Sequence, residues 1–349
     1  MKPKYLERIP ELDGMIEKAR VVTIVTHTHP DGDAIGSGLA MKHYLRKCRG
    51  KDACLVIPDP VPNTLAFLIA DEPEGEILTH SRAPLQASRQ VADSDLILCQ
   101  DLNALSRTAG LETALRISPA PKILIDHHLN PDFDAFRLAF STPDISSTSE
   151  YVYWILKEMP DIDGEASRLP AAARKHLLAG MTTDTNNFAN SVFPSTLKMA
   201  SELLDAGEDR DTLLAELYNN YRENRIRVMG YLLYEKLKIT PEGAAYMILT
   251  KEDQDRFDLR DGESEGFVNM PLEIDRVCLS LFLKEEDGHF RVSLRSKKGV
   301  SANDCAMACF HGGGHELAAG GKLYFPEDVP APSSAEAYIL KVIKRFFKS

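Results

Sequence analysis

Short apolar runs alternate with amphipathic helical stretches through the first half of the chain. Buried strands are predicted at residues 21–25, 53–57, 95–99 and 122–125. Helical spacing of apolar positions follows or separates them, for example at residues 35–46, 146–159 and 171–183. Alternation of this kind predicts an α/β fold in which a parallel sheet carries helices on both faces. Ligands of such sheets bind beyond the carboxyl ends of the strands.

The pattern changes in the second half. Residues 194–234 have helical spacing and are rich in Leu, Glu, Arg and Asn, whereas apolar or alternating runs at 246–250, 277–285 and 290–296 predict strands. We therefore expect a parallel-sheet domain at 1–193, a helical linker at 194–238 and a smaller α+β domain at 239–349. The tail, residues 337–349, has an apolar stripe at helical spacing and is predicted to dock as a helix.

Composition narrows the class of protein. The chain has 349 residues, 44% of them hydrophobic and 27% charged, which is ordinary for a globular protein large enough for two domains. Its formal net charge of −11 argues against a general binder of long duplexes, which would show a broad basic surface. A nucleotide or short oligonucleotide needs only a local basic pocket and stays possible.

Cysteine usage and the N-terminus bear on location. The six cysteines contain no CxxC pair and are expected to be free thiols in a reducing cytosol. Residues 1–20 are charged throughout, without the apolar core of a signal peptide, and no run approaches the ~18 apolar residues of a spanning helix. We expect a cytoplasmic protein with no membrane partner.

Acidic residues and histidines cluster at four places. These are the segment HTHPDGD at residues 27–33, Asp101, the segment DHH at residues 126–128, and Asp184. Three of the four directly follow predicted strands, so a parallel sheet would bring them to one edge. Carboxylate oxygens and imidazole nitrogens are ligands of divalent cations, and the clusters therefore predict one metal site.

The segment HTHPDGD offers several ligands. His27 and Asp31 are four residues apart in a predicted loop that can wrap one ion, and Asp33 can reach a second. Gly32 is expected to let the backbone fold so that both carboxylates point inward. His29 is expected to flank the site or face the substrate. The alternative is a surface turn with incidental charges.

Asp101 and Asp184 each stand alone in the sequence, and the ordinary alternative to metal binding for such an Asp is a helix cap or a turn. Beside His27, however, Asp101 can bridge two ions. Adjacent histidines in a loop point in different directions, so one of His127 and His128 can bind metal while the other contacts substrate. Asp126 can orient an imidazole. Asp184 ends a helical stretch.

A glycine-rich segment, HGGGHELAAGG at residues 311–321, lies near the C-terminus. Consecutive glycines let backbone N–H groups approach an anion, and His315 can donate to a phosphate oxygen. Arg295 lies in RVSLRSKKGV, which has four basic residues and no acidic one, and arginine suits bidentate phosphate recognition. The alternatives are a flexible turn for the glycines and a solvated turn for the lysines. The chain has no P-loop, no HExxH and no GxGxxG after its first strand.

Several short segments follow one another in the order in which they occur in a known family. They are THTHPDGDAIGS, DHH, STSE, TDT, EGFVNMPL, SLRS and GGGHELAAGG. Over about residues 21–323 the chain resembles the DHH phosphoesterases that carry the DHH-associated C-terminal domain. The resemblance implies two divalent ions, Mn²⁺ in the first place with Mg²⁺ or Co²⁺ as alternatives. It implies that their ligands are His27, Asp31, Asp33, Asp101, His127 and Asp184, with Asp101 as the bridge.

The resemblance also implies roles in substrate handling. His128 would lie near the scissile phosphate, and Arg295, Gly312, Gly313, Gly314 and His315 would hold the substrate from the second domain. His311 stands where the family usually has Gly or Asn, so its role is open between a phosphate contact and simple packing.

Together these features predict metal-dependent hydrolysis of a phosphoester by an activated water. The expected substrate is a short single-stranded RNA or 3′-phosphoadenosine-5′-phosphate. The alternatives are cyclic-di-AMP or its linear dinucleotide, and, in another class, a nucleotide-binding sensor without turnover. Catalysis would need the two domains to face one another, and the family suggests a homodimer.

Overall fold

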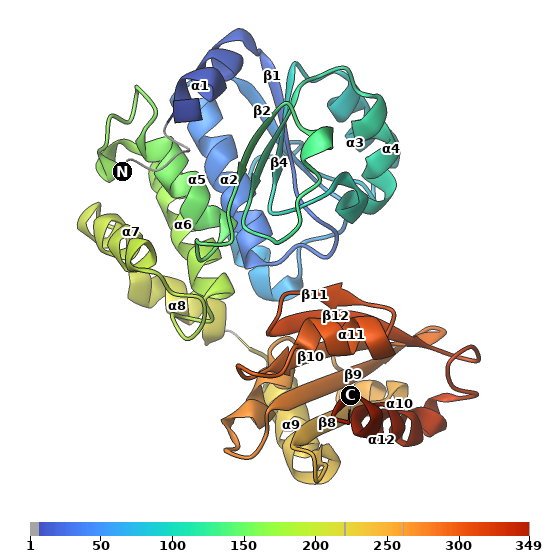
Figure 1. Ribbon diagram of the computed structural model, residues 1–349. Coiled ribbons are helices and arrows are strands. Elements are labelled where there is room, and N and C mark those ends of the chain that lie inside the picture. The colour runs from blue at the N-terminus through green and yellow to red at the C-terminus, as the bar shows by residue number, and fades with distance from the viewer. Residues whose placement is uncertain (1–6, 220, 261, 349) are drawn as a thin grey trace. The chain divides into compact units, whose positions relative to one another are not determined.

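The computed structural model describes residues 7–219, 221–260 and 262–348 (Figure 1). The chain divides into two compact units, Met1–Asn220 and Tyr221–Ser349. This division assigns α7 (Pro194–Asp205) and α8 (Arg210–Tyr218) to the first unit and α9 (Glu223–Tyr231) to the second. The helices of residues 194–238 are therefore shared between the units.

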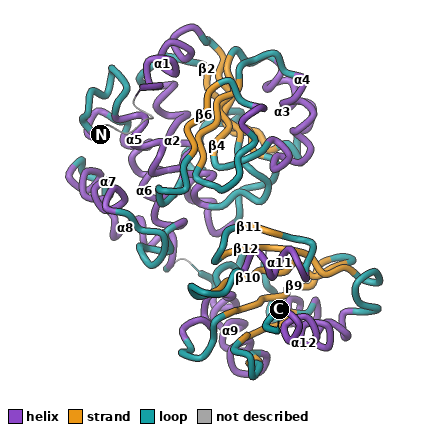
Figure 2. The backbone as a smooth tube through the Cα atoms, in the orientation of Figure 1, coloured by secondary structure: helices purple, strands orange, loops and turns teal. Residues whose placement is uncertain are grey.

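The first unit is built on a six-stranded sheet with the strand order β3-β2-β1-β4-β5-β6 (Figure 2). Every strand pair in it is parallel. Its strands are β1 (Val21–Val25), β2 (Asp52–Ile57), β3 (Ile77–Thr79), β4 (Leu96–Gln100), β5 (Lys122–Asp126) and β6 (Leu138–Ser141). The predicted parallel sheet is confirmed, and β3 and β6 extend it at its two edges.

Helices cover both faces of this sheet, as predicted. Besides α7 and α8 they are α1 (Ile9–Lys18), α2 (Gly32–Lys47), α3 (Pro84–Ala92), α4 (Glu112–Ile117), α5 (Thr148–Lys157) and α6 (Ala171–Asp184). The shorter 3₁₀ segments are η2 (Asn63–Leu68), η3 (Leu105–Leu111), η4 (Phe133–Ala135) and η5 (Ala166–Arg168). Because strand residues alternate between faces, Val22 and Ile24 share a core with α1, α2, α5 and α6, whereas Val25 shares one with α3 and α4 (Figure 1).

The strand order changes direction between β1 and β4. The chain leaves β1 for β2 and β3 on one side, then returns to β4 on the other side of β1. The connections after β1 and β4 therefore diverge at the carboxyl edge of the sheet, where open α/β sheets bind ligands. His27 follows β1 closely and Asp101 directly follows β4.

The second unit contains a mixed sheet with the strand order β11-β12-β10-β9-β8-β7. Only β8 and β9 are parallel among its pairs in the described residues. The strands are β7 (Lys238–Ile239), β8 (Ala244–Leu249), β9 (Leu279–Glu286), β10 (His289–Ser296), β11 (Gly313–Gly314) and β12 (Ala318–Tyr324). The mixed or antiparallel sheet predicted from the alternating runs is confirmed, and it is mixed.

Helices pack on this second sheet as well. They are α9, α10 (Lys251–Arg256), α11 (Ala302–Cys309) and α12 (Ala335–Phe346), with the short segments η6 (Leu232–Lys236), η7 (Phe267–Glu273) and η8 (Pro332–Ser334). The predicted tail helix is present as α12, and its Ile339 and Ile343 belong to the core beneath β10. Among the described helices, none has the length and apolar composition needed to cross a bilayer.

Candidate metal centre

The loop after β1 and the start of α2 carry the first acidic–histidine cluster. Asp31 caps α2, since its Oδ1 accepts hydrogen bonds from the backbone N–H groups of Asp33 and Ala34, both at 3.0 Å. The helix therefore begins at Gly32, earlier than the predicted residue 35. His27 is buried, and its Nδ1 donates to the Thr28 carbonyl at 2.7 Å. This bond leaves the lone pair of the neutral ring on Nε2, the atom that faces the carboxylates.

Gly32 was predicted to allow a tight turn of the backbone, but the structure requires a glycine there because two helices approach closely. Its φ is not positive, so the turn needs no glycine there. A Cβ on Gly32 would instead lie 2.3 Å from Oγ1 of Thr183, in the last turn of α6. The glycine thus allows the first turn of α2 to approach the end of α6, which carries Asp184.

Asp101 lies at the centre of the carboxylates and imidazoles. Its Oδ2 is 3.3 Å from Nε2 of His27, and its Oδ1 is 3.5 Å from Nε2 of His127. The residue is 1% exposed and has a left-handed backbone with φ 57°. Few residues other than glycine adopt this conformation, although Asp and Asn are among those that do. Thr148 Oγ1 also donates to Oδ1 of Asp101 at 3.1 Å.

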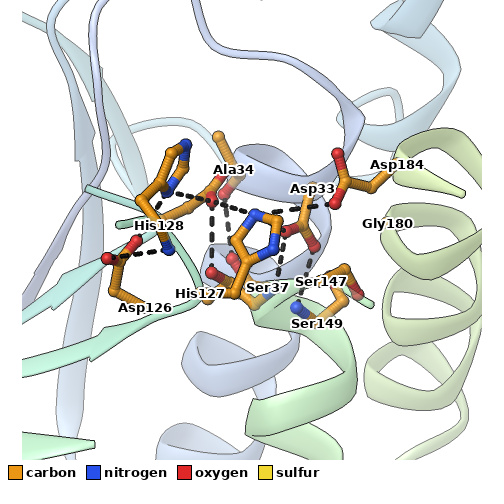
Figure 3. A network of polar contacts seen from close by, with 12 residues as sticks. Asp33, Ala34, Ser37, Asp126, His127, His128, Ser147, Ser149, Gly180 and Asp184 are labelled. Atoms are coloured by element: carbon orange, nitrogen blue, oxygen red, sulfur yellow. Dashed lines mark hydrogen bonds and ion pairs between the residues drawn. The ribbon is translucent and has the colours of Figure 1, made fainter. Parts of the chain in front are cut away.

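The two histidines after β5 point in different directions, as predicted, with ring planes inclined at 67° (Figure 3). His127 directs Nε2 toward Asp33 Oδ2 at 3.9 Å and Asp184 Oδ2 at 3.5 Å. His128 instead donates from Nδ1 to Oδ1 of Asp126 at 2.7 Å, and its backbone N–H donates to Oδ2 at 3.1 Å. Asp126 is fully buried, so this carboxylate fixes the position of the His128 ring.

Asp33 is held by the start of α5. The backbone N–H groups of Thr148 and Ser149 donate to its two oxygens at 2.7 and 2.8 Å (Figure 3). These are first-turn amides, which have no partner within the helix and favour a negative charge. Ser147 caps the same helix by accepting from the backbone N–H of Glu150.

The electrostatics of the cluster favour positive charge. Burial by itself lowers the pKa of His27, but the hydrogen bond to Asp101 and the charges of Asp31 and Asp101 outweigh it and raise this pKa to about 9. Burial, together with the charges of Asp101 and Asp184, raises the pKa of Asp33 well above its ordinary value. For Asp101, burial acts in the same direction, yet His27 and the other two imidazoles hold its pKa below the ordinary value.

The ligand atoms form compact groups that share one residue. One group is His27, Asp31 and Asp101, and a second is Asp33, Asp101 and His127, with the atoms of each group within 4.8 Å of one another. Asp184 adjoins the second group through His127. Oxygen and imidazole donors in such groups fit divalent first-row cations and Mg²⁺. His29, which was not expected to bind metal, points to Asp59 instead, with Nδ1 3.8 Å from Oδ2.

The residues expected to hold substrate lie in the second unit. Arg295 is on β10 and lines a small surface hollow together with Ser293, Arg291, Lys284 and the segment 264–266. Gly313 and Gly314 form β11, which pairs with Gly320 and Ala319 of β12. A Cβ on Gly312 would lie 1.9 Å from the Gly320 carbonyl oxygen, so the glycine is needed for this close pairing.

The two histidines beside these glycines have different surroundings. His311 has a left-handed backbone and is exposed, and its Nε2 donates to Oδ1 of Asp328 at 2.9 Å. The backbone N–H of His315 donates to the Ala318 carbonyl at 2.7 Å, closing the turn between β11 and β12. The glycine-rich segment is therefore an ordered hairpin.

Comparison with known proteins agrees with this geometry. Residues 21–182 match the family described as "DHH family, N-terminal domain", and residues 243–349 match the "DHHA1 domain". The bifunctional oligoribonuclease and PAP phosphatase NrnA of Thermus thermophilus is 30% identical over 338 residues, which cover 92% of this chain and 90% of that protein. The chain belongs to the DHH family. The family resemblance inferred from the motifs is thereby confirmed.

The chain is similar to two further proteins over nearly its whole length. The crystal structure of an exopolyphosphatase-related protein from Bacteroides fragilis is 35% identical, has a TM-score of 0.89 and covers 98% of this chain and 97% of that one. The cyclic-di-AMP phosphodiesterase PdeA of Listeria monocytogenes is 24% identical over 97% of this chain, but this covers only 49% of that longer protein.

Sequence reasoning missed two contributors to this DHH-family site. Thr148 and Ser149 hold Asp33 and Asp101 from the start of α5. The motif STSE was the sequence signal for the helix start that carries them, because Ser followed three residues later by Glu is typical of a helix N-terminus. The helix had been predicted from residue 146, but nothing in the sequence showed that its first amides would face a carboxylate.

Proposed function

We propose that this protein is a metal-dependent phosphoesterase that hydrolyses short oligoribonucleotides and 3′-phosphoadenosine-5′-phosphate. The observation that carries the proposal is the pair of ligand groups joined by the two oxygens of Asp101. Paired groups with a shared carboxylate are the arrangement that two-metal hydrolases use. The DHH-family relatives, which include a bifunctional oligoribonuclease and PAP phosphatase, support the choice of substrate.

The proposed metal ligands divide between the groups. His27 and Asp31 would hold one divalent ion, and Asp33, His127 and Asp184 the other, with Asp101 touching both; Mn²⁺ is the expected metal. When bound, the ions would lower the pKa of a water molecule and neutralise charge on the phosphate oxygens. The chain itself positions the ligands: Thr28 orients His27, and the first turn of α5 holds Asp33.

His128 is proposed to act on the substrate rather than on the metals, with Asp126 holding its ring. Asp126 accepts from Nδ1 of His128 at 2.7 Å, and we assign Nε2 of the same ring to contact with a phosphate oxygen. The buried carboxylate fixes the ring in one orientation, and a hydrogen-bond donor held in place can stabilise negative charge in the transition state. Asp126 would then be a positioning residue for His128.

The second unit is proposed to hold the substrate. Arg295 can bind a phosphate through two N–H groups. Arg291 and Lys284 line the same hollow, where Arg291 pairs with Glu265 at 3.6 Å. Gly312, Gly313, Gly314 and His315 would lie beside a second phosphate or the sugar. The N–H groups of Gly312 and Gly314 already donate to the Ala306 carbonyl and to Asn303 Oδ1, so these glycines would allow close approach of the substrate rather than supply both hydrogen bonds. We assign hydrolysis to residues 1–193 and substrate holding to residues 239–349, and we leave His311 as a further candidate contact.

A cyclic dinucleotide is the second candidate substrate, because the chain is similar over nearly its whole length to the phosphodiesterase PdeA. That relative is about twice as long, so the likeness is weaker support than the NrnA match, which spans most of both proteins. A sensor without turnover is disfavoured because all six proposed ligands are present and converge.

The test is an assay of purified, chelator-treated protein with Mn²⁺ on a labelled RNA of two to five nucleotides, on 3′-phosphoadenosine-5′-phosphate and on cyclic-di-AMP. We expect release from the first two and little from the third. His27→Gln should abolish turnover, whereas His29→Gln, two residues away and exposed, should retain it. Bound metal with no release from any substrate would favour the sensor instead.

A further inference from the structure

A second group of imidazoles and a carboxylate lies inside the first unit, outside the site described above. It consists of His43 on α2, Glu72 after η2, and His176 on α6. Each side chain offers one ligand atom, and these atoms all lie within 4.8 Å of one another. His43 Nε2 is 2.7 Å from Glu72 Oε1, and the two imidazole rings stack in parallel with centroids 5.2 Å apart.

His176 has a buried nitrogen without a partner. The side chain is 5% exposed, and Nε2 is 2.9 Å from the Leu68 carbonyl. A carbonyl oxygen only accepts, so Nε2 carries the proton and Nδ1 keeps the lone pair. This Nδ1 is buried and makes no hydrogen bond within the described chain. A buried polar atom left unpaired costs free energy, so its presence in a native fold calls for an explanation.

The arrangement of His176 is that of a metal ligand. Histidines that bind metals almost always donate their other ring N–H to a backbone carbonyl or a carboxylate, which fixes the lone pair toward the ion. The ring is also neutral at pH 7, because burial lowers the pKa of His176 to about 4. Neutral imidazole is the form that binds a cation.

We propose that His43 Nε2, Glu72 Oε1 and His176 Nδ1 form a further divalent-cation site, of the kind that takes Zn²⁺. Two imidazoles and one carboxylate are a known zinc donor set, with water as the fourth ligand. The His43 side chain is 14% exposed, which gives this water access from solvent. Binding needs the lone pair of His43 on Nε2, with the ring proton on Nδ1, and it needs the two rings to turn out of their parallel stack so that both lone pairs face the ion.

Lys42 determines which carboxylate oxygen of Glu72 is available to bind the proposed cation. Its ammonium group is fully buried and donates to Glu72 Oε2 and, at 2.8 Å, to Glu76 Oε2. Arg46 pairs with the other oxygen of Glu76 at 2.7 Å. The two cations and two carboxylates balance one another, and Oε1 of Glu72 is left to face the imidazoles.

The proposed site joins the same two helices that carry the candidate metal centre. His43 lies ten residues after Asp33 on α2, about 15 Å along the helix axis. His176 lies eight residues before Asp184 on α6, about 12 Å along its axis. An ion there would stabilise the α2–α6 pair and not take part in hydrolysis.

A count of bound zinc per chain tests this site. The full chain is treated with chelator, saturated with Zn²⁺ and passed through gel filtration before the zinc is measured. We expect His43→Gln and His176→Gln each to lose one equivalent per chain relative to the wild type, while Mn²⁺-dependent hydrolysis is retained. The control is His289→Gln, which removes an imidazole paired with Glu286 at 3.2 Å in the second unit and should keep the wild-type count. Equal zinc counts in all four proteins would overturn the proposal.

A measurement on the wild type covers the case in which a variant does not fold. Crystals soaked with Zn²⁺ should show an anomalous peak at the zinc edge, bounded by His43, Glu72 and His176. The zinc should also raise the melting temperature of the wild type by more than that of a folded variant, which keeps only the ligands around Asp101. A map without this peak would overturn the proposal, whatever ions occupy the site around Asp101.

Discussion

Oδ2 of Asp101 lies 3.3 Å from Nε2 of His27. The other oxygen of the same carboxylate faces His127 at 3.5 Å. His27 comes from the loop after β1 and Asp101 from the end of β4, the two strands between which the sheet changes direction. One side chain thus connects two ligand groups that reach the edge of the sheet from different parts of the chain.

The hydrogen bond between Asp126 and His128 should matter for turnover more than for metal content. In Asp126→Asn the ring loses the carboxylate that orients it, and we expect kcat to fall about 10–100-fold. KM and bound metal should change little, because Asp126 is proposed neither to ligate an ion nor to bind substrate. Steady-state kinetics with metal analysis separates these quantities; loss of metal would show that Asp126 is itself a ligand.

The close approach of α2 and α6 should be sensitive to one added methyl group. A Cβ on Gly36 would lie 2.6 Å from the His176 carbonyl oxygen and 2.9 Å from the backbone of Gly180, so the helices must separate. We expect Gly36→Ala to lower the free energy of unfolding by about 1–3 kcal/mol and to reduce activity, since Asp33 and Asp184 move with these helices.

Gly14→Ala is the matched control for this change. Gly14 lies within α1, and a Cβ there would have no atom within 4 Å. Because alanine favours a helix interior over glycine, the control should be neutral or more stable by up to about 1 kcal/mol. Urea denaturation measures both variants, and equal effects would mean that the helix contact is not what makes Gly36 necessary.

Arg295→Ala should raise KM for a dinucleotide at least about 10-fold while metal content stays at the wild-type level. The reason is that Arg295 lines the hollow of the second unit, whereas the proposed metal ligands belong to the first. Lys298→Ala, in the exposed turn after β10, serves as the control and should be silent. Loss of metal in Arg295→Ala would contradict this division of roles.

Much of the fold could be predicted because strands buried on both faces appear as continuous apolar runs. The same reasoning failed for β3 and β6, which are edge strands of three and four residues with partly exposed side chains. Their sequences, ILT and LAFS, are too short to give a periodic signal.

The convergence of His27, Asp101 and Asp126 could be predicted from the parallel sheet alone, since each lies at or just beyond a strand end. The supports of the site could not. Ser149 acts through a backbone amide that has no side-chain signature, and Gly32 is needed because of Thr183, a contact between residues far apart in the chain. The His43–Glu72–His176 group was missed for the same reason.

Thiol reactivity should be concentrated at Cys309. A hydrogen bond from Cys305 is the main cause that lowers the pKa of Cys309 to about 7; burial opposes it, and Arg345 adds to it. Burial raises the pKa of Cys99 to about 12. Because the thiolate is the nucleophile, alkylation of Cys309 by iodoacetamide should accelerate as pH rises through about 7, with Cys99 unreactive.

Mass spectrometry of the alkylated peptides identifies the modified residue, and Cys309→Ser is the comparison. The fast phase of labelling should disappear in this variant. An unchanged fast phase would show that another thiol carries it and that the pair on α11 does not activate Cys309.

Asp101 is proposed to serve both ligand groups of a hydrolytic metal site. Asp101→Asn tests it most directly, because Asn also tolerates the left-handed backbone at φ 57° and so removes the charge without straining the fold. The measurement is kcat/KM on a labelled diribonucleotide at saturating Mn²⁺, with a melting curve as the folding control. We predict a loss of at least about 100-fold in a folded protein; a rate near that of the wild type would contradict the account.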